Sequence, residues 1–186
     1  VDFTTIAAPS LKAGSAVYVN AGSASITNSI IASYATGLQN NIGSPVSTAV
    51  SLYDNTTNLS GSISSGSLLT VNPQFLNPAA GDYHLGAGSA AIDAAVGSAT
   101  VDLDGYARPL GAARDMGAYE AQLIVNSTGD GADAAPGDGI CETATPGECT
   151  LRAAIQEANA SAGANAIFFN IAGAGVQTIA PATALP

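Results

Sequence analysis

Apolar residues alternate with small polar residues through most of residues 1–121, and glycine, serine, asparagine and proline separate the alternating runs. A period of two residues is typical of a β-strand with one buried face. We therefore expect a series of short strands in this part of the chain and no helix. The expected strands span residues 1–6, 16–19, 24–31, 50–53 and 67–71.

Residues 122–186 follow a different pattern. A short strand is expected over residues 123–126, followed by an acidic, glycine-rich loop and then by a stretch with helical periodicity, residues 150–160. Thr150 is suited to the N-cap of this helix, and Gly163 can end it. Two further strands are expected over residues 166–171 and 175–179.

The composition helps to choose between two folds that are built from many short strands, a β-sandwich and a β-solenoid. Large aromatic side chains commonly fill the core between two packed sheets, but this chain has no tryptophan, four phenylalanines and six tyrosines. The narrower interior of a parallel β-solenoid suits Val, Ile, Leu and Ala, while Ser, Thr and Asn stack on like residues in neighbouring coils. The expected fold class is therefore mostly β, a parallel β-helix (solenoid) with one short capping α-helix.

The charge balance narrows the classes of partner. Fourteen acidic residues stand against four basic ones in 186 residues, which gives a formal net charge of −10. Nucleic acids and anionic membranes would repel such a chain, so neither nucleic-acid binding nor membrane insertion is expected. The scarcity of lysine and arginine suits a protease-rich exterior, and the first residues lack the pattern of a signal peptide. We expect a secreted protein, extracellular or on the cell surface, in its mature form.

A group of motifs follows the expected strands of the first part. They are NPQFL at 72–76, DYHL at 82–85, GSAAID at 88–93, DLDGYARPLG at 102–111 and DMGAYE at 115–120. Together they resemble the closing segment of secreted bacterial right-handed parallel β-helix proteins. The resemblance implies that residues 1–121 are the C-terminal coils and the closing segment of a right-handed β-helix.

A second group of motifs lies in residues 122–186. It consists of LIVN at 123–126, PGDGIC at 136–141 and CTLRAAIQEAN at 149–159. This group resembles the CSLREA-type segment that opens such β-helices, in which a strand, a loop and a capping helix precede the first coil. Thr150 and Ala153 replace the usual Ser and Glu of the motif, and both are compatible with a capping role.

The two segments stand in the reverse of the family's order, so the chain is expected to have an unfinished β-helix at each end. Stacking the starter coil of one copy on the open coils of the next would cover both ends. We therefore expect a structural protein that forms an extracellular filament, a head-to-tail homopolymer, and no enzymatic activity. The expected contact residues are Val1, Phe3, Ile6, Val17 and Val19 on one copy and Ile167, Phe169, Ile171, Val176 and Ile179 on the next. The alternatives are a segment of a larger passive adhesin or stalk, and a polysaccharide-binding or lyase-like module.

Residues 122–186 contain a candidate disulfide and a candidate calcium site. Cys141 and Cys149 are the only cysteines, eight positions apart, and in an exported protein they are expected to form a disulfide. Asp130, Asp133 and Asp138 lie in the glycine-rich loop, where carboxylates could bind calcium. A solvated turn stabilised by Asx-type hydrogen bonds is the alternative for this loop. Calcium is the single cofactor that the sequence suggests.

Charged residues also gather in the closing segment. Two of the four basic residues lie there, and we expect the group to form ion pairs that tie the closing turns together. Paired acids and an arginine would also suit a glycosidase or a lyase. Residues that could act as a catalytic base are scarce, however, because His84 is the only histidine and Lys12 the only lysine. His84 is expected at a surface or edge rather than as a general base. The expected ion-pairing residues are Asp102, Asp104, Arg108, Arg114, Asp115 and Glu120.

Overall fold

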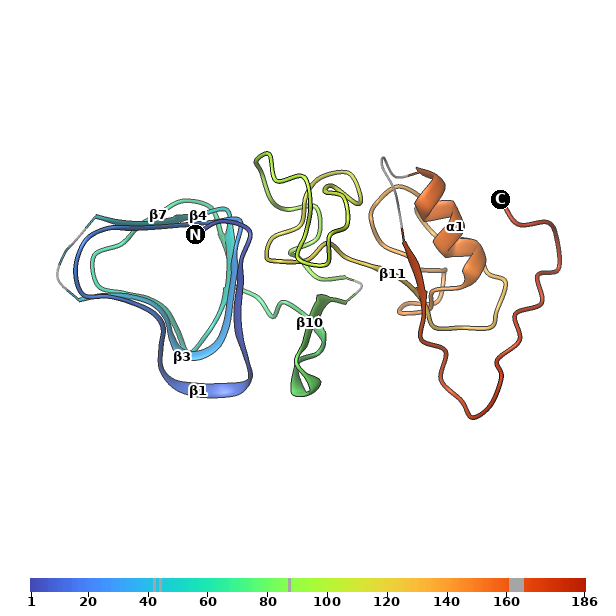
Figure 1. Ribbon diagram of the computed structural model, residues 1–186, viewed down its shortest axis with the longest axis horizontal. Helices are drawn as coiled ribbons and strands as arrows, with labels where there is room; N and C mark the ends of the chain where they lie inside the picture. Colours follow the sequence, from blue (N-terminus) through green and yellow to red (C-terminus); the bar gives the residue numbers. More distant parts are fainter. Residues whose placement is uncertain (42, 44, 87, 161–165) are drawn as a thin grey trace.

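The computed structural model describes residues 1–41, 43, 45–86, 88–160 and 166–186. These residues are mostly β, with parallel sheets and one α-helix, as the alternating pattern predicts. The expected helix stop at Gly163 lies outside the described residues. Figure 1 shows a stack of strands at one side of the molecule, an irregular middle part and the helix-containing C-terminal part at the other side.

Four stretches of chain, residues 1–19, 24–40, 46–60 and 64–69, lie side by side, and we call them stacked segments 1 to 4. In Figure 1 they follow similar outlines, one behind another. Their strands are β1 (Thr5–Val19), β2 (Ala24–Thr27), β3 (Ile30–Asn40), β4 (Val46–Ala49), β5 (Ser51–Asp54), β6 (Thr57–Ser60), β7 (Ser64–Ser65) and β8 (Leu68–Leu69).

All pairings among these strands are parallel. One sheet has the order β1-β3-β5-β8, with β6 beside β3, and a second has the order β2-β4-β7. The expected strand over residues 24–31 is divided into β2 and β3 because Asn28 adopts a positive φ of 49°, which turns the chain from one sheet into the other. β1 contains the strand expected over residues 16–19 and only the last two residues of the strand expected over residues 1–6.

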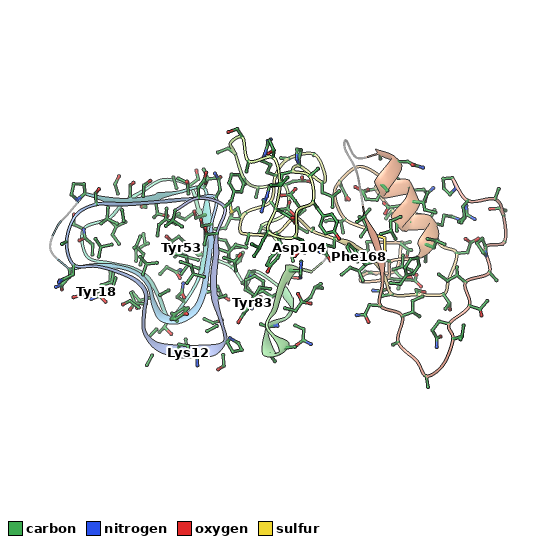
Figure 2. The ribbon with its side chains drawn as sticks, viewed as in Figure 1. Lys12, Tyr18, Tyr53, Tyr83, Asp104 and Phe168 are labelled. Atoms are coloured by element: carbon green, nitrogen blue, oxygen red, sulfur yellow. A yellow bond between two sulfur atoms is a disulfide. The ribbon has the colours of Figure 1, made fainter. Side chains whose placement is uncertain are left out.

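The start of the strand β3 is buried on both faces, because its successive side chains enter two different clusters. Ile31 and Leu38 point into the stack, where they pack with Ile26 and the fully buried Tyr53. Figure 2 shows Tyr53 within the outline of the stacked segments. Ile30, which precedes Ile31 and so points to the opposite face, lies in a second cluster that includes residues of the closing segment. The closing segment therefore covers the outer face of this sheet.

Stacked segment 1 is longer than the segments below it. Ile6 pairs with Ile31, and Val17 pairs with Leu38. Val17 follows Ile6 by eleven positions, whereas Leu38 follows Ile31 by only seven. The four extra residues form a bulge with one register shift on each side of Lys12. In Figures 1 and 2, β1 protrudes at this bulge, and Lys12 lies at its outer limit.

The stack is followed by an antiparallel hairpin of β9 (Phe75–Asn77) and β10 (Asp82–Leu85). The 3-10 helix η1 (Pro78–Ala80) joins the two strands, so the expectation of no helix before residue 121 is wrong at this turn. Asn77 accepts a hydrogen bond from the backbone of Ala80, which caps the turn. Residues 86–121 contain no regular strand among those described and are held together largely by side-chain hydrogen bonds.

The C-terminal part contains β11 (Leu123–Val125), α1 (Leu151–Ala160) and β12 (Ile167–Phe169), with β12 parallel to β11. Thr150 caps α1 by accepting a hydrogen bond from the backbone N–H of Ala153 (3.1 Å). Leu123, Val125, Ala153, Ala154 and the two cysteines form a separate core. The strand expected over residues 175–179 is absent, because no neighbouring strand lies beside this segment among the described residues.

Candidate functional site

The outer edge of β1 is the longest unpaired strand edge that the described residues present. β1 has fifteen residues and, among the described residues, pairs only with β3. At the opposite end of the stack, β7 and β8 have two residues each. An unpaired edge exposes backbone N–H and C=O groups that can pair with a further strand. The edge is therefore a candidate site for association with another β-segment.

Two regular arms flank the bulge of β1. Residues 5–7 and 15–19 are in register with β3, while the bulge between them carries Pro9, Leu11 and Lys12. Proline, lysine and bulges are features that protect sheet edges against indiscriminate pairing. A partner strand without a matching bulge must shift register at this point, as β3 does, whereas a partner with a similar bulge can follow the whole edge.

The expected contact residues of segment 1 have three different environments. Ile6, Val17 and Val19 face the interior of the stack. The guanidinium of Arg108 lies 4.8 Å from the centre of the Phe3 ring, so the closing segment covers Phe3. Val1 is exposed.

The second expected contact surface lies after β12. Asn170 continues the pairing by donating its backbone N–H to the carbonyl of Val125 (2.8 Å), and the chain then forms an exposed arch. Figure 1 shows this arch, in red, running from β12 to the C-terminus. Of the expected residues, Ile167, Ile171 and Ile179 pack against the C-terminal core, whereas Phe169 and Val176 are exposed.

Arg152 anchors the far end of this arch. Its Nη1 donates to the carbonyl of Ala184 (3.0 Å), and its Nη2 donates to the carbonyl of Thr183 (3.0 Å). Its Nε also donates to Asp130 (2.9 Å), and this carboxylate accepts the backbone N–H of Ala182. The hydrogen bond from Arg152 holds the pKa of Asp130 below its usual value. The arch is thus held at both ends by hydrogen bonds. The sequence pattern did not indicate this role of Arg152.

The expected ion-pair group in the closing segment is buried, and one member organises it. Arg108 donates to the carboxylate of Glu120 (2.7 Å) and to the carbonyls of Asp115 and Gly117 (2.9 and 2.8 Å). The side chains of Arg108 and Glu120 are each 1% exposed. Arg108 and Glu120 thus form a buried ion pair within the closing segment.

The other expected members of the group act mainly through backbone contacts. Asp115 accepts the backbone N–H of Asp93 and of Ala121, and Asp102 accepts those of Tyr106 and Glu120. The Nε of Arg114 donates to the carbonyl of Ala99 (2.6 Å). The carboxylates therefore serve as the partners that an irregular, partly buried backbone needs.

Burial of these acids shifts their titration. Desolvation, followed by the nearby charge of Glu120, raises the pKa of Asp115 to about 8. Desolvation also raises the pKa of Glu120, against the opposing effect of its backbone hydrogen bonds and of Arg108. The protonated form of Asp115 is consequently favoured in the folded state at mildly acidic pH.

His84 links the hairpin to the loop around Asp104. Its Nδ1 lies 2.6 Å from Asp82 and its Nε2 lies 2.7 Å from Asp104, and its ring packs against Tyr119. Burial alone would lower the pKa of His84, but the hydrogen bonds to Asp104 and Asp82 outweigh it and raise the pKa. Asp82 and His84 are two apart on β10, a spacing that places them on one face and could have revealed this contact.

Contacts from the same loop also join the two parts of the chain. Asp104 accepts a hydrogen bond from the side chain of Gln122 (2.9 Å). The rings of Tyr106 and Phe168 meet edge to face at 5.7 Å. Figure 2 shows Asp104 and Phe168 at this junction, between the irregular middle part and β11.

The three acids proposed for calcium do not form one cluster. Asp130 pairs with Arg152, Asp133 accepts the backbone N–H of Ala135, and Asp138 accepts that of Ile140. The last two contacts are the local turns that the alternative interpretation expects. Within the described ranges, no three metal-ligating side chains gather at one point. Calcium binding stays a prediction.

Glu157 provides a contact that the sequence did not indicate. This fully buried carboxylate on α1 accepts the backbone N–H groups of Gly137 and Gly139 (2.5 and 2.7 Å), and so fixes the acidic loop to the helix. Cys141 and Cys149 form the expected disulfide at the end of the same loop, with a Cα–Cα distance of 5.3 Å.

Replacing Glu157 by Ala is expected to lower the free energy of unfolding by about 2–4 kcal/mol, because two backbone donors lose a charged acceptor in a buried place. Urea denaturation at neutral pH with the disulfide intact measures the change. The matched control is Asn159→Ala at an exposed position of the same helix, which should change stability by less than about 0.5 kcal/mol. Equal effects of the two substitutions would contradict this role of Glu157.

No known protein family, curated protein or solved structure that was compared with the chain matches it. None of the helices in the described residues is long and apolar enough to cross a membrane.

Proposed function

We propose that this protein is a structural subunit of an extracellular filament and that it assembles head to tail. In this proposal the stacked segments are coils of a right-handed parallel β-helix, and the C-terminal starter of one copy stacks on stacked segment 1 of the next. The observation that carries the proposal is the fifteen-residue β1, whose outer edge has no partner among the described residues.

Hydrogen bonds at the edge of β1 favour association, but apolar burial must add to them. Each hydrogen bond that the two arms of β1 regain contributes about 1 kcal/mol, and a few such bonds are comparable only to the low end of the roughly 4–15 kcal/mol cost of association. Apolar burial at about 25 cal/mol per Å² must supply the rest. Leu11 and Tyr18 on β1, and Phe169 and Val176 on the starter, are exposed side chains that could provide it.

The distribution of charge favours contact between unlike surfaces. Residues 1–71 contain Asp2, Asp54 and Lys12, a net charge of −1, whereas residues 122–186 contain six acids and one arginine, a net charge of −5. Two starters facing each other would repel, while a starter facing stacked segment 1 meets little charge of its own sign. A contact between two different surfaces of the same molecule does not close on itself and so produces a filament.

Deletion of residues 175–186 is expected to abolish polymers while leaving the body of the protein folded, because it removes most of the arch but no strand of the stack. Light scattering and negative-stain electron microscopy of the full chain and of the truncated chain measure assembly, and circular dichroism checks the fold. A full chain that stays monomeric at micromolar concentration would contradict the proposal, and so would a truncated chain that still forms filaments.

A pair of point substitutions provides the matched comparison. Val176 is 94% exposed on the arch, and Val71 is exposed near the opposite end of the stack. Val176→Asp should reduce polymer formation at least tenfold, because it places a buried charge in the proposed contact. Val71→Asp should leave assembly unchanged.

A further inference from the structure

The spacing of core residues differs between the levels of the stack. Val17 follows Ile6 by eleven positions, Leu38 follows Ile31 by seven, and Leu59 follows Tyr53 by six. The members of each series are matched by register and contribute to the same core. Stacked segment 1 therefore has a longer path between its two inward positions than any segment with which it is aligned.

The starter spans a similarly long path. Ile167 on β12, and Ile171 and Ile179 on the arch, all pack against the C-terminal core, and the first and last of them are twelve positions apart. This value is within one residue of the eleven positions on segment 1 and exceeds the seven positions on segment 2 by five. One residue of difference is easily absorbed in an irregular segment, whereas five residues require a bulge of their own.

From this match we infer the register of the contact between copies: Ile167 of one copy lies beside Ile6 of the next, and Ile179 lies beside Val17. The inference rests on the proposed function and specifies its interface. Residues 10–13 lie within the bulge and equal in number the extra positions of β1. A partner with an equally long path can follow β1 across the bulge, whereas a shorter partner shifts register there, as β3 does. The bulge therefore favours a partner with a long path.

The state of the arch is consistent with a strand that lacks its partner. Residues 175–179 have a strand-like sequence, rich in β-branched residues, but they are almost entirely exposed and form no ladder. The pairing of β12 fixes the start of the arch, and Arg152 fixes its end. The segment is thus held near the starter and can become a strand when the edge of β1 from another copy supplies hydrogen bonds.

The inferred register places Ala180 beside the exposed Tyr18, and introduced cysteines test this pairing. Neighbouring strands are about 4.8 Å apart, a Cα separation that a disulfide can bridge. One batch of protein carries Tyr18→Cys and another carries Ala180→Cys, and the two are mixed in equal amounts and oxidised. We expect a covalent dimer on a non-reducing gel, with the linked peptides identified by mass spectrometry.

The control mixture combines Tyr18→Cys with Thr178→Cys, which lies two residues out of register. Its Cα separation would be roughly 8 Å, beyond the range of a disulfide. We expect at least fivefold less linked dimer than in the first mixture. Filaments that show equal linkage in both mixtures, or more linkage in the control, would overturn the register and leave the proposed function standing. The absence of both linkage and polymers would overturn both.

Deletion of residues 10–13 tests the bulge itself. It shortens the path from Ile6 to Val17 to seven positions, the value found in segment 2, so the chain should fold and its filament mass should fall at least tenfold. Circular dichroism checks the fold. A folded deletion variant that polymerises like the unmodified chain would overturn the selective role of the bulge.

Discussion

Replacing Arg108 by Met is expected to destabilise the protein by about 3–5 kcal/mol. The substitution leaves the buried carboxylate of Glu120 without its cation and removes the donors to the carbonyls of Asp115 and Gly117. It also removes the contact between the guanidinium and Phe3, which joins the closing segment to stacked segment 1. Chemical denaturation followed by tyrosine fluorescence or circular dichroism measures the loss.

Arg114→Met is the matched control, because it removes the same charge from the same segment. Arg114 is only partly buried, and its side chain donates a hydrogen bond to the carbonyl of Ala99. Its replacement should cost about 1 kcal/mol or less. A double variant, Arg108→Met with Glu120→Met, should recover part of the lost stability, since no unpaired buried charge remains. Similar losses of stability in Arg108→Met and Arg114→Met would contradict a special contribution of the buried ion pair to stability.

The stability of the protein is expected to fall by about 2–4 kcal/mol between pH 5 and pH 9. The pKa of Asp115 is raised to about 8 in the folded protein, chiefly by burial and next by the charge of Glu120. A group with a raised folded pKa contributes stability that is fully present below its unfolded pKa, here 3.8, and is lost as the pH rises through about 8. His84, with a pKa above 6.5, acts in the same direction through its bridge between Asp82 and Asp104.

Melting temperatures measured across this pH range test the prediction. Asp130 and Glu148 have lowered pKa values, because Arg152 and Thr143 respectively donate hydrogen bonds to them, and they would lose their contributions only in more acidic solution. Asp115→Asn should flatten the pH dependence, although the amide satisfies one backbone donor fewer and lowers stability at all pH values. His84→Gln should flatten only the part near neutral pH. An unchanged slope in Asp115→Asn would contradict the assignment to this carboxyl.

The same stabilising contacts connect to the proposed assembly. Phe3 and Thr5 of stacked segment 1 are held by the closing segment, through Arg108 and through the backbone N–H of Ala118. The flank of β1 is therefore covered, while its outer edge is free in the described residues. Loss of the Arg108 cluster should loosen the first arm of β1 before the core of the stack.

Elements with local signals could be predicted from the amino-acid sequence. Alternation over residues 24–31 and 50–53 indicates strands because neighbouring side chains point to opposite faces, and β2, β3 and β5 lie there. The apolar stripe and Thr150 indicate α1 because the N-cap and the helical period are properties of a few consecutive residues. The disulfide followed from having two cysteines a short distance apart in an expected exported protein.

Features that depend on the neighbours of a segment could not be predicted, because they arise when distant parts of the chain meet. Residues 175–179 have the composition of a strand but no neighbouring strand to pair with, so they form an arch, whereas the bulge of β1 emerges only from its register against β3. The pairing of Arg108 with Glu120, and of His84 with Asp82 and Asp104, likewise depends on the path of the backbone between them. Strand pairing and buried charge both need partners from elsewhere in the chain, and a local pattern of residues does not contain them.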